Sequence, residues 1–127
     1  MKKQLDQVAE FHEAFGVPNL ENAQIPDKER VALRVKLIQE ELDELKEGLA
    51  DNDLTEVADA LTDIQYVLLG TVLEFGLQDK FEALFDEVHQ SNMSKLDENG
   101  KPIHRADGKV MKSERYFPPD LKSILNS

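Results

Sequence analysis

The chain has 127 residues, a length close to the commonest domain size, which predicts a single domain over residues 1–127. Fifteen Lys and Arg stand against 26 Asp and Glu, a net charge of −11, which argues against binding of nucleic acid or of acidic membranes. There is no cysteine to form disulfides or thiolate metal sites, and no apolar stretch approaches the ~18 residues of a membrane span. We therefore expect a soluble, cytoplasmic protein.

The first part of the chain shows helical periodicity. Apolar side chains recur at helical spacing in four segments, residues 3–15, 27–49, 53–75 and 79–94. Asp53, with Glu56 three residues later, predicts a capping box at the start of the third segment, and Gly76 should end it. We predict an all-α fold with a four-helix-bundle-like core over about residues 3–95.

The rest of the chain, about residues 96–127, is predicted to be a short loop or hairpin tail. Asp107-Gly108 lies between Ile103-His104 and Val110-Met111, which favours a small hairpin. The tail also differs in charge, because residues 95–115 carry 6 basic and 4 acidic side chains while the first 94 residues carry 8 and 21. This basic stretch is the first indication of a functional division within the chain.

Two groups of carboxylates lie off the solvated faces of the second and third helices. Glu40, Glu41 and Glu44 fall within an arc of about 100° on a partly apolar face. Glu56, Asp59 and Asp63 form a line on the third helix, whose second half is apolar almost all round and should be central in a bundle. Solvated carboxylates are the alternative interpretation.

Facing carboxylates inside a bundle repel each other unless protons or cations neutralise them. Carboxylate oxygens without Cys or paired His favour Mg²⁺, with Mn²⁺ as a substitute. A ferritin-like di-iron site would need two Glu-x-x-His elements, and the chain has none. The two acidic groups therefore predict a magnesium site, which would also let an acidic protein accept a polyanionic substrate.

Several polar residues are candidates for substrate binding. Asn92 and Lys95 continue the apolar stripe of the fourth helix and should face the bundle, where they could meet phosphates; the alternative is an ordinary helix C-terminus. His12 lies on the apolar stripe of the first helix, where a hydrogen-bonded core histidine is the favoured interpretation and contact with a base is the alternative. Weaker candidates, for which a solvated tail is the alternative, are Lys109, Lys112, Arg115 and Tyr116.

The acidic residues also form a motif. Residues 40–44 read EELDE, and after eleven residues 56–59 read EVAD. This resembles the EExxE…ExxD signature of the all-α nucleoside triphosphate pyrophosphohydrolases, the superfamily of MazG, dimeric dUTPase and phosphoribosyl-ATP pyrophosphohydrolase. The resemblance covers about residues 5–95, and the segment SNMSK at 91–95 is similar to a MazG-like subgroup.

The resemblance implies Mg²⁺-dependent hydrolysis of a (deoxy)nucleoside triphosphate to the monophosphate and pyrophosphate. The resemblance further implies that Glu41 would orient or deprotonate the attacking water. The metal ligands that it implies are Glu41, Glu44, Glu56 and Asp59, with Glu40 in addition. A homodimer or homotetramer is also implied, in agreement with apolar residues on nearly every side of the third helix. Phosphoribosyl-ATP hydrolysis is the nearest alternative, which the SNMSK-like segment disfavours. A non-catalytic helical interaction module is the alternative from another class.

Overall fold

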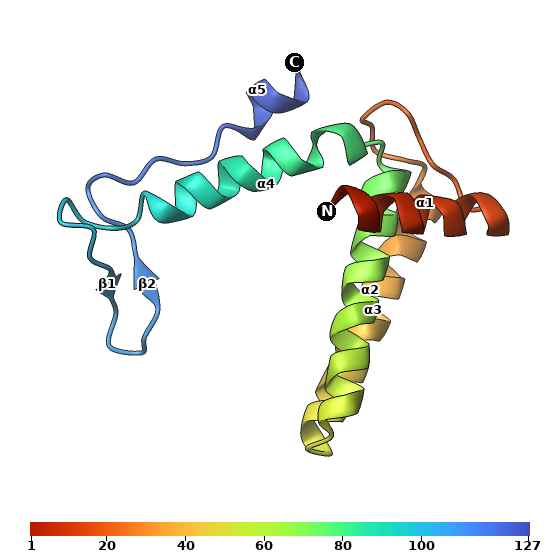
Figure 1. The fold of residues 1–127 in the computed structure, drawn as a ribbon, viewed down its shortest axis with the longest axis horizontal. Helices are drawn as coiled ribbons and strands as arrows, with labels where there is room; N and C mark the ends of the chain where they lie inside the picture. Colours follow the sequence, from red (N-terminus) through yellow and green to blue (C-terminus); the bar gives the residue numbers. More distant parts are fainter. The chain divides into compact units, whose positions relative to one another are not determined.

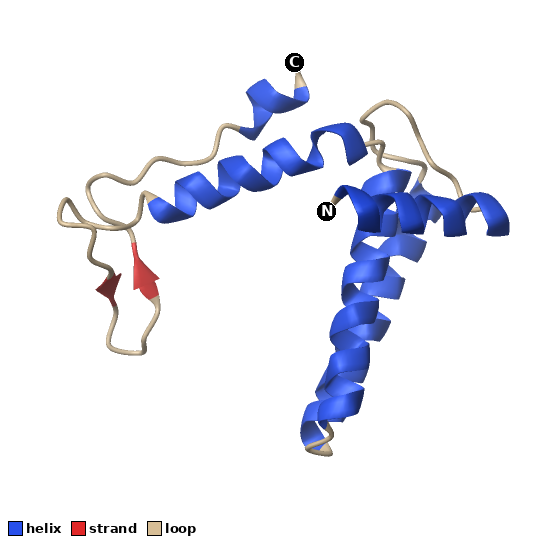
Figure 2. Ribbon diagram, in the orientation of Figure 1, coloured by secondary structure: helices blue, strands red, loops and turns tan.

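The computed structural model describes all 127 residues and divides them into two compact units, Met1–Asp79 and Lys80–Ser127. Almost all the regular structure is helical, with one small antiparallel pair of strands (Figure 2). The predicted all-α class is therefore confirmed. The single domain over residues 1–127 stays a prediction.

The first unit contains three helices, each within two residues of its predicted bounds. Helices α2 (Lys28–Ala50) and α3 (Leu54–Glu74) lie side by side as a helical hairpin, and α1 (Lys2–Phe15) packs against α3 near the end away from their connection (Figure 1). The core lies where α1 meets α3, and its buried apolar side chains are Leu5, Val8, Ala60, Leu69, Val72 and Leu73. The core therefore attaches α1 to α3 at the open end of the hairpin.

Helix α3 begins at the predicted N-cap. The Asp53 side chain accepts hydrogen bonds from the backbone N–H groups of Thr55 (3.0 Å) and Glu56 (3.2 Å). The reciprocal half of the predicted capping box is absent, because the Asp53 N–H donates to the carbonyl of Gly48 at 3.0 Å. The carboxylate of Glu56 is thus not used in the cap.

Helix α3 ends before Gly76, as predicted. Gly76 has φ +67°, and a Cβ atom there would overlap the carbonyl oxygen of Asn22, so a side chain is excluded on two grounds. The α1–α2 loop passes over this point, with the Leu20 N–H donating to Leu73 O at 3.0 Å. The close loop contact explains why the end of this helix is a glycine.

The second unit contains most of α4 (Gln78–Met93), the predicted hairpin of β1 (Ile103–His104) and β2 (Val110–Met111), and a short helix α5 (Leu121–Leu125) that the sequence analysis did not predict. Serine hydroxyls attach the tail to the end of α4: Ser91 donates to Phe117 O at 2.8 Å and Ser113 to Leu96 O at 2.7 Å. That α4 completes a four-helix core stays a prediction.

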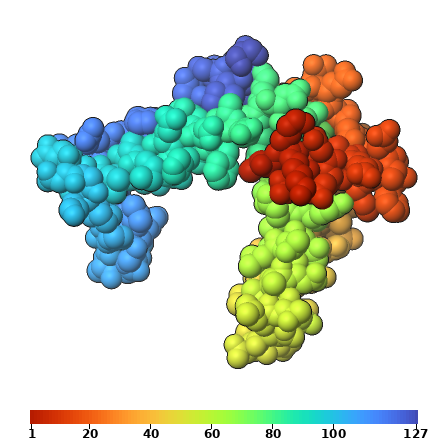
Figure 3. Space-filling model, in the orientation of Figure 1, coloured from red at the N-terminus to blue at the C-terminus, as the bar shows by residue number.

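The hairpin of α2 and α3 exposes apolar side chains along its length. The part near the connection projects beyond α1 (Figure 3). Six of the exposed apolar residues recur every seven positions, Val35, Leu42 and Leu49 on α2 and Leu54, Leu61 and Leu68 on α3. No single helix is long and apolar enough to cross a membrane; by length and composition alone, α3 and α4 would reach that threshold only as a broken pair.

Candidate functional site

Contacts at both ends of the α2–α3 hairpin fix the register of the two helices. Near the connection, a Cβ on Gly48 would lie 3.2 Å from the backbone nitrogen of Val57. Toward the other end, Arg34 lies against Gly70 and donates from Nη2 to the carbonyl of Val67 at 2.8 Å. Between these two contacts, the acidic motif of α2 lies opposite the acidic line of α3, as the sequence predicted.

Three carboxylates meet at the centre of this seam. Glu41 and Glu44 of α2 and Asp63 of α3 each place an oxygen within 4.8 Å of the others. Glu41 and Asp63 are half-buried, and Oε2 of Glu41 is buried without a hydrogen-bond partner. No cationic side chain of the chain neutralises the three within the ion-pair distances of the structure, since no salt bridge involves them.

Burial and the neighbouring carboxylates raise the pKa values of Glu41 and Asp63. Burial, followed by a hydrogen bond with Glu44 and the charges of Glu44, Asp63 and Asp59, raises the pKa of Glu41 to about 7. Burial, together with the charges of Asp59 and Glu44, raises the pKa of Asp63. A proton or a cation is therefore needed to hold this cluster together at neutral pH.

A hollow of about 440 Å³ continues the cluster toward the connection, and its wall is formed by Glu44, Glu47, Thr55, Glu56 and Asp59. Glu44 belongs to both the cluster and the hollow, so the carboxylates form one continuous row. We call this the acid row; it consists of Glu41, Glu44, Glu47, Glu56, Asp59 and Asp63. The structure thus brings together four of the five predicted ligands. Glu40 is exposed and lines no hollow of the row, and its role as a ligand stays a prediction.

The sequence analysis left two members of the row out of its ligand set. Asp63 was placed in the acidic line of α3, but the motif stops at Asp59. Glu47 was not considered. Helical spacing carried the signal for both, because Asp63 follows Asp59 by one turn and Glu47 follows Glu44 by one turn on the same face.

At its other end the acid row adjoins a second hollow of about 270 Å³, which we call the Arg34 hollow; its wall includes Phe11, His12, Arg34, Glu41, Asp63 and Tyr66. His12 is buried, and its Nδ1 lies 3.1 Å from Pro18 O and 2.9 Å from Asn19 Oδ1. His12 is thus a buried, hydrogen-bonded histidine, which is the interpretation that the sequence analysis favoured. It also lines the hollow, so its contact with a base stays a prediction.

Arg34 belongs to a group of two arginines and one glutamate that the sequence analysis missed, in which Arg34 and Glu74 are buried. Its Nη1 lies 2.9 Å from Oε2 of Glu74, and its Nε donates to the Thr71 hydroxyl at 3.1 Å. Arg30 donates from Nε to Oε1 of Glu74 at 2.7 Å. Burial lowers the pKa of Arg34, and the charge of Glu74 opposes this effect. Glu74 is the only charged residue in the apolar second half of α3, which could have identified it.

The predicted phosphate-binding residues lie in the second unit. Asn92 is exposed and Lys95 is half-buried just after the end of α4. The ammonium group of Lys112 lies 4.7 Å from the centre of the Tyr116 ring, so these two are brought together, while Lys109 and Arg115 are exposed. A role of any of these residues in substrate binding stays a prediction.

The chain matches the family model of phosphoribosyl-ATP pyrophosphohydrolase over residues 8–92, which include the whole acid row. That family belongs to the MazG-like nucleoside triphosphate pyrophosphohydrolase superfamily, whose enzymes are typically dependent on divalent metals. The resemblance stated from the acidic motif is therefore confirmed. The chain is also 32% identical over 96 residues to the uncharacterized protein L479 of Acanthamoeba polyphaga mimivirus; the match covers 72% of this chain and 38% of the viral protein, so the chain spans well under half the length of that relative.

Proposed function

Because the chain belongs to the phosphoribosyl-ATP pyrophosphohydrolase family, a family of pyrophosphohydrolases acting on nucleotides, we propose that it hydrolyses a (deoxy)nucleoside triphosphate to the monophosphate and pyrophosphate with Mg²⁺. The observation that carries this proposal is the meeting of Glu41, Glu44 and Asp63 within 4.8 Å without a compensating cation. Such a cluster is costly unless it has a cationic ligand to bind.

The residues of the acid row fit a hard divalent cation. The side chains of the row offer only carboxylate oxygens as ligand atoms, and the hollow adds the hydroxyl of Thr55. Oε2 of Glu41 is buried without a hydrogen-bond partner. We propose Glu41, Glu44, Glu56 and Asp59 as ligands of Mg²⁺, with Glu40 in addition, and the geometry adds Asp63. When bound, Mg²⁺ or Mn²⁺ would offset the carboxylate charge, polarise phosphate oxygens and lower the pKa of a water molecule.

Within this row, Glu41 is our candidate for the residue that orients or deprotonates the attacking water. It is half-buried at the point where the row adjoins the Arg34 hollow, so it is placed between the two spaces that a nucleotide would need to occupy. A half-buried carboxylate with one unpartnered oxygen can accept a hydrogen bond from water in a fixed direction.

Cationic and polar residues of the second unit would balance the charge of the leaving pyrophosphate. We propose this role for Asn92 and Lys95, and also for Lys109, Lys112 and Tyr116. Phosphoanhydride hydrolysis is accelerated by hydrogen-bond donors aimed at the developing negative charge. The acid row contains no such donor among its side chains other than Thr55, so the donors must come from elsewhere.

We further propose that the protein forms a homodimer or homotetramer. Three exposed apolar residues on each of α2 and α3 recur every seven positions, a repeat that is typical of helices packed into coiled-coil-like bundles. A second copy of the same hairpin offers the same spacing, and symmetric self-association is the commonest way to cover such a surface. Light scattering at micromolar concentration tests this, and a monomer mass would contradict it.

Phosphoribosyl-ATP is the second candidate substrate. The observation that favours it is the family whose model the chain matches. Both reactions break a phosphoanhydride bond and release pyrophosphate, so both would use the same acid row. The two substrates differ in the part attached to the base, and the SNMSK segment at residues 91–95 favours the nucleoside triphosphate.

The deciding experiment is a substrate panel with resolved products. The purified protein is incubated with each canonical ribo- and deoxyribonucleoside triphosphate and with phosphoribosyl-ATP, in Mg²⁺ and in EDTA. We expect pyrophosphate and a monophosphate from at least one triphosphate, in Mg²⁺ only. Turnover of phosphoribosyl-ATP alone would favour the second candidate. If no substrate is turned over, the remaining hypothesis is that the protein is a non-catalytic helical interaction module.

A further inference from the structure

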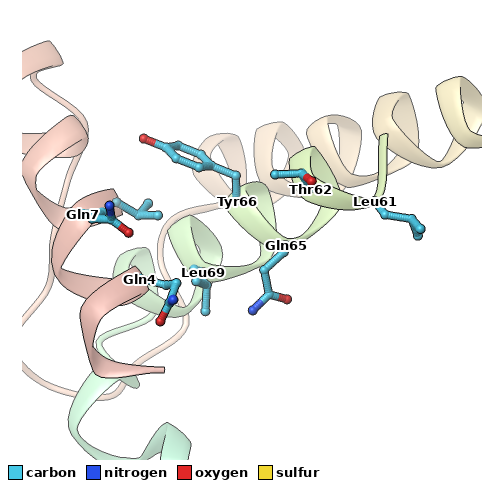
Figure 4. A pocket seen from close by; sticks show the side chains of 8 residues that line it. Gln4, Gln7, Leu61, Thr62, Gln65, Tyr66 and Leu69 are labelled. Carbon is cyan, nitrogen blue, oxygen red and sulfur yellow. The ribbon is translucent and has the colours of Figure 1, made fainter. Parts of the chain in front are cut away.

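The hollows of the first unit offer no unpaired cation to a phosphate group. Carboxylates line the hollow of the acid row, and the arginine of the Arg34 hollow is paired with Glu74. In a third hollow, of about 580 Å³ between α1 and α3, neutral side chains such as Gln65 surround an apolar floor (Figure 4). Basic side chains are instead in excess in the second unit, over residues 95–115.

Lys95 is a half-buried cation of the second unit without a counter-ion. It lies just after the end of α4, and no salt bridge involves its ammonium group, although Asp97 and Glu98 follow it closely in the chain. A charge that is partly removed from water is unfavourable unless a group of opposite sign meets it. The ammonium group of Lys95 is therefore suited to bind an anion, provided that the backbone that carries it is held in place.

The hydroxyl of Ser113 holds this backbone. Its Oγ lies 3.1 Å from Ser94 O and 2.7 Å from Leu96 O, which are the carbonyl oxygens on either side of Lys95. Because a carbonyl can only accept, the hydroxyl proton is directed at these two oxygens. The same Oγ accepts a hydrogen bond from the N–H of Arg115 at 3.1 Å, so its donor and its acceptor are both used.

The tail has a second attachment to the end of α4 that does not involve Ser113. The buried Ser91 donates from its hydroxyl to Phe117 O at 2.8 Å, and the N–H of Phe117 donates to the hydroxyl of Ser94 at 3.1 Å. These bonds can keep the tail on α4 when the Ser113 hydroxyl is removed. The bonds of Ser113 itself serve the short segment that carries Lys95.

We propose that Ser113 is a positioning residue for phosphate binding: its hydroxyl fixes the backbone on both sides of Lys95 and so holds the ammonium group ready for the anion. This inference rests on the proposed function, since it takes the anion to be the triphosphate of the substrate or the pyrophosphate product. Side chains that are ordered before a ligand arrives lose less conformational entropy on binding. Ser113 touches no phosphate in this arrangement and acts only through Lys95.

The test measures binding of pyrophosphate by calorimetric titration in Mg²⁺. Ser113→Ala removes the hydroxyl, Ser113→Thr keeps it, and the double variant Ser113→Ala/Lys95→Ala shows whether the serine acts through the lysine. Ser123→Ala is the matched control, because Ser123 lies in the same tail and its hydroxyl donates to Oδ2 of Asp120 at 2.7 Å. Hydrogen exchange at the N–H of Phe117 reports whether the tail stays attached to α4.

We expect Ser113→Ala to weaken pyrophosphate binding by about tenfold, because the loss of one well-placed hydrogen bond has an effect of this order. The N–H of Phe117 should stay protected in this variant. In the Lys95→Ala background, the same substitution should add no more than about a twofold loss. Ser113→Thr and Ser123→Ala should bind pyrophosphate within about twofold of the wild type.

Undiminished binding in Ser113→Ala, or an equal loss from this substitution with and without Lys95, would overturn the inference. Loss of protection at the N–H of Phe117 would also overturn it, because Ser113 would then have only a structural role in attaching the tail. Each of these results leaves the proposed function intact if a triphosphate is turned over. The expected binding pattern without turnover of any nucleotide would instead contradict the proposed function and leave this inference intact.

Discussion

The same α2–α3 seam carries two charged groups of opposite character. At one end, Arg30 and Arg34 both pair with Glu74; Arg34 and Glu74 are buried, and Arg30 is half-buried. Along the rest of the seam, the acid row has carboxylates only, and the pKa values of Glu41 and Asp63 are raised. The paired group can hold the helices in register without help. The unpaired row destabilises the isolated chain and is suited to bind a cation, which is the difference between a structural and a functional charge cluster.

The largest effect should follow from breaking the Arg34–Glu74 pair. Glu74→Met leaves Arg34 buried without a counter-ion, and loss of one partner of a buried pair typically costs about 3–5 kcal/mol of unfolding free energy. The double variant Arg34→Met/Glu74→Met removes both buried charges and leaves only Arg30, which is partly exposed, so it should recover most of the loss. Urea denaturation measures both. Equal stability of wild type and Glu74→Met would contradict the view that this group holds the helices together.

The second prediction concerns the unbalanced row. Glu41→Gln and Asp59→Asn should each lower turnover by at least ~10²-fold, because each removes a charge that the metal or the attacking water requires. Neither should lower the unfolding free energy in EDTA, since each relieves repulsion. Asp43→Asn is the matched control, because Asp43 is exposed on the same helix and accepts only from Gln39 at 2.9 Å. Undiminished turnover in either active-site variant, or in EDTA, is the result that would falsify the metal mechanism.

The acid row and the group of Arg30, Arg34 and Glu74 differ in how far the sequence predicts them. The helices were predicted within two residues because apolar spacing, Asp53 and Gly76 are local signals. The acid row followed from helical angles within each helix. The pairing of Arg34 with Glu74 joins residues 40 positions apart and depends on the register between two helices, which no single helix encodes. Helix α5 was missed because five residues carry too little periodicity.

A third, smaller effect is expected at the end of α4. Lys95→Ala should lower kcat/KM by about 10 to 150-fold if its ammonium group contacts phosphate, as charge-assisted bonds contribute roughly 1.5–3 kcal/mol. Its effect on folding should stay within ~1 kcal/mol, the usual contribution of a charge near a helix end. Asn92→Ala should follow the same pattern. Steady-state kinetics and thermal melts decide, and unchanged kcat/KM in both variants removes the pair from the site.

The smallest effect should be a pH dependence of stability that separates the two regions. The pKa of Glu41 is raised from its ordinary value of 4.5 to about 7, so the folded state holds a proton that the unfolded state has already lost. The contribution of Glu41 to stability is therefore complete below about pH 4.5 and is lost as the pH rises through about 7.

In EDTA, the unfolding free energy of the wild type should accordingly fall between these pH values, and Glu41→Gln should flatten that fall. Excess Mg²⁺ should reverse the trend, because a metal competes with the proton for the same carboxylates and binds more tightly as they ionise. Urea titrations at several pH values, with and without Mg²⁺, measure both slopes. A fall of equal steepness in wild type and Glu41→Gln would locate the pH dependence outside the acid row, and an unchanged slope in Mg²⁺ would mean that the row does not bind the metal.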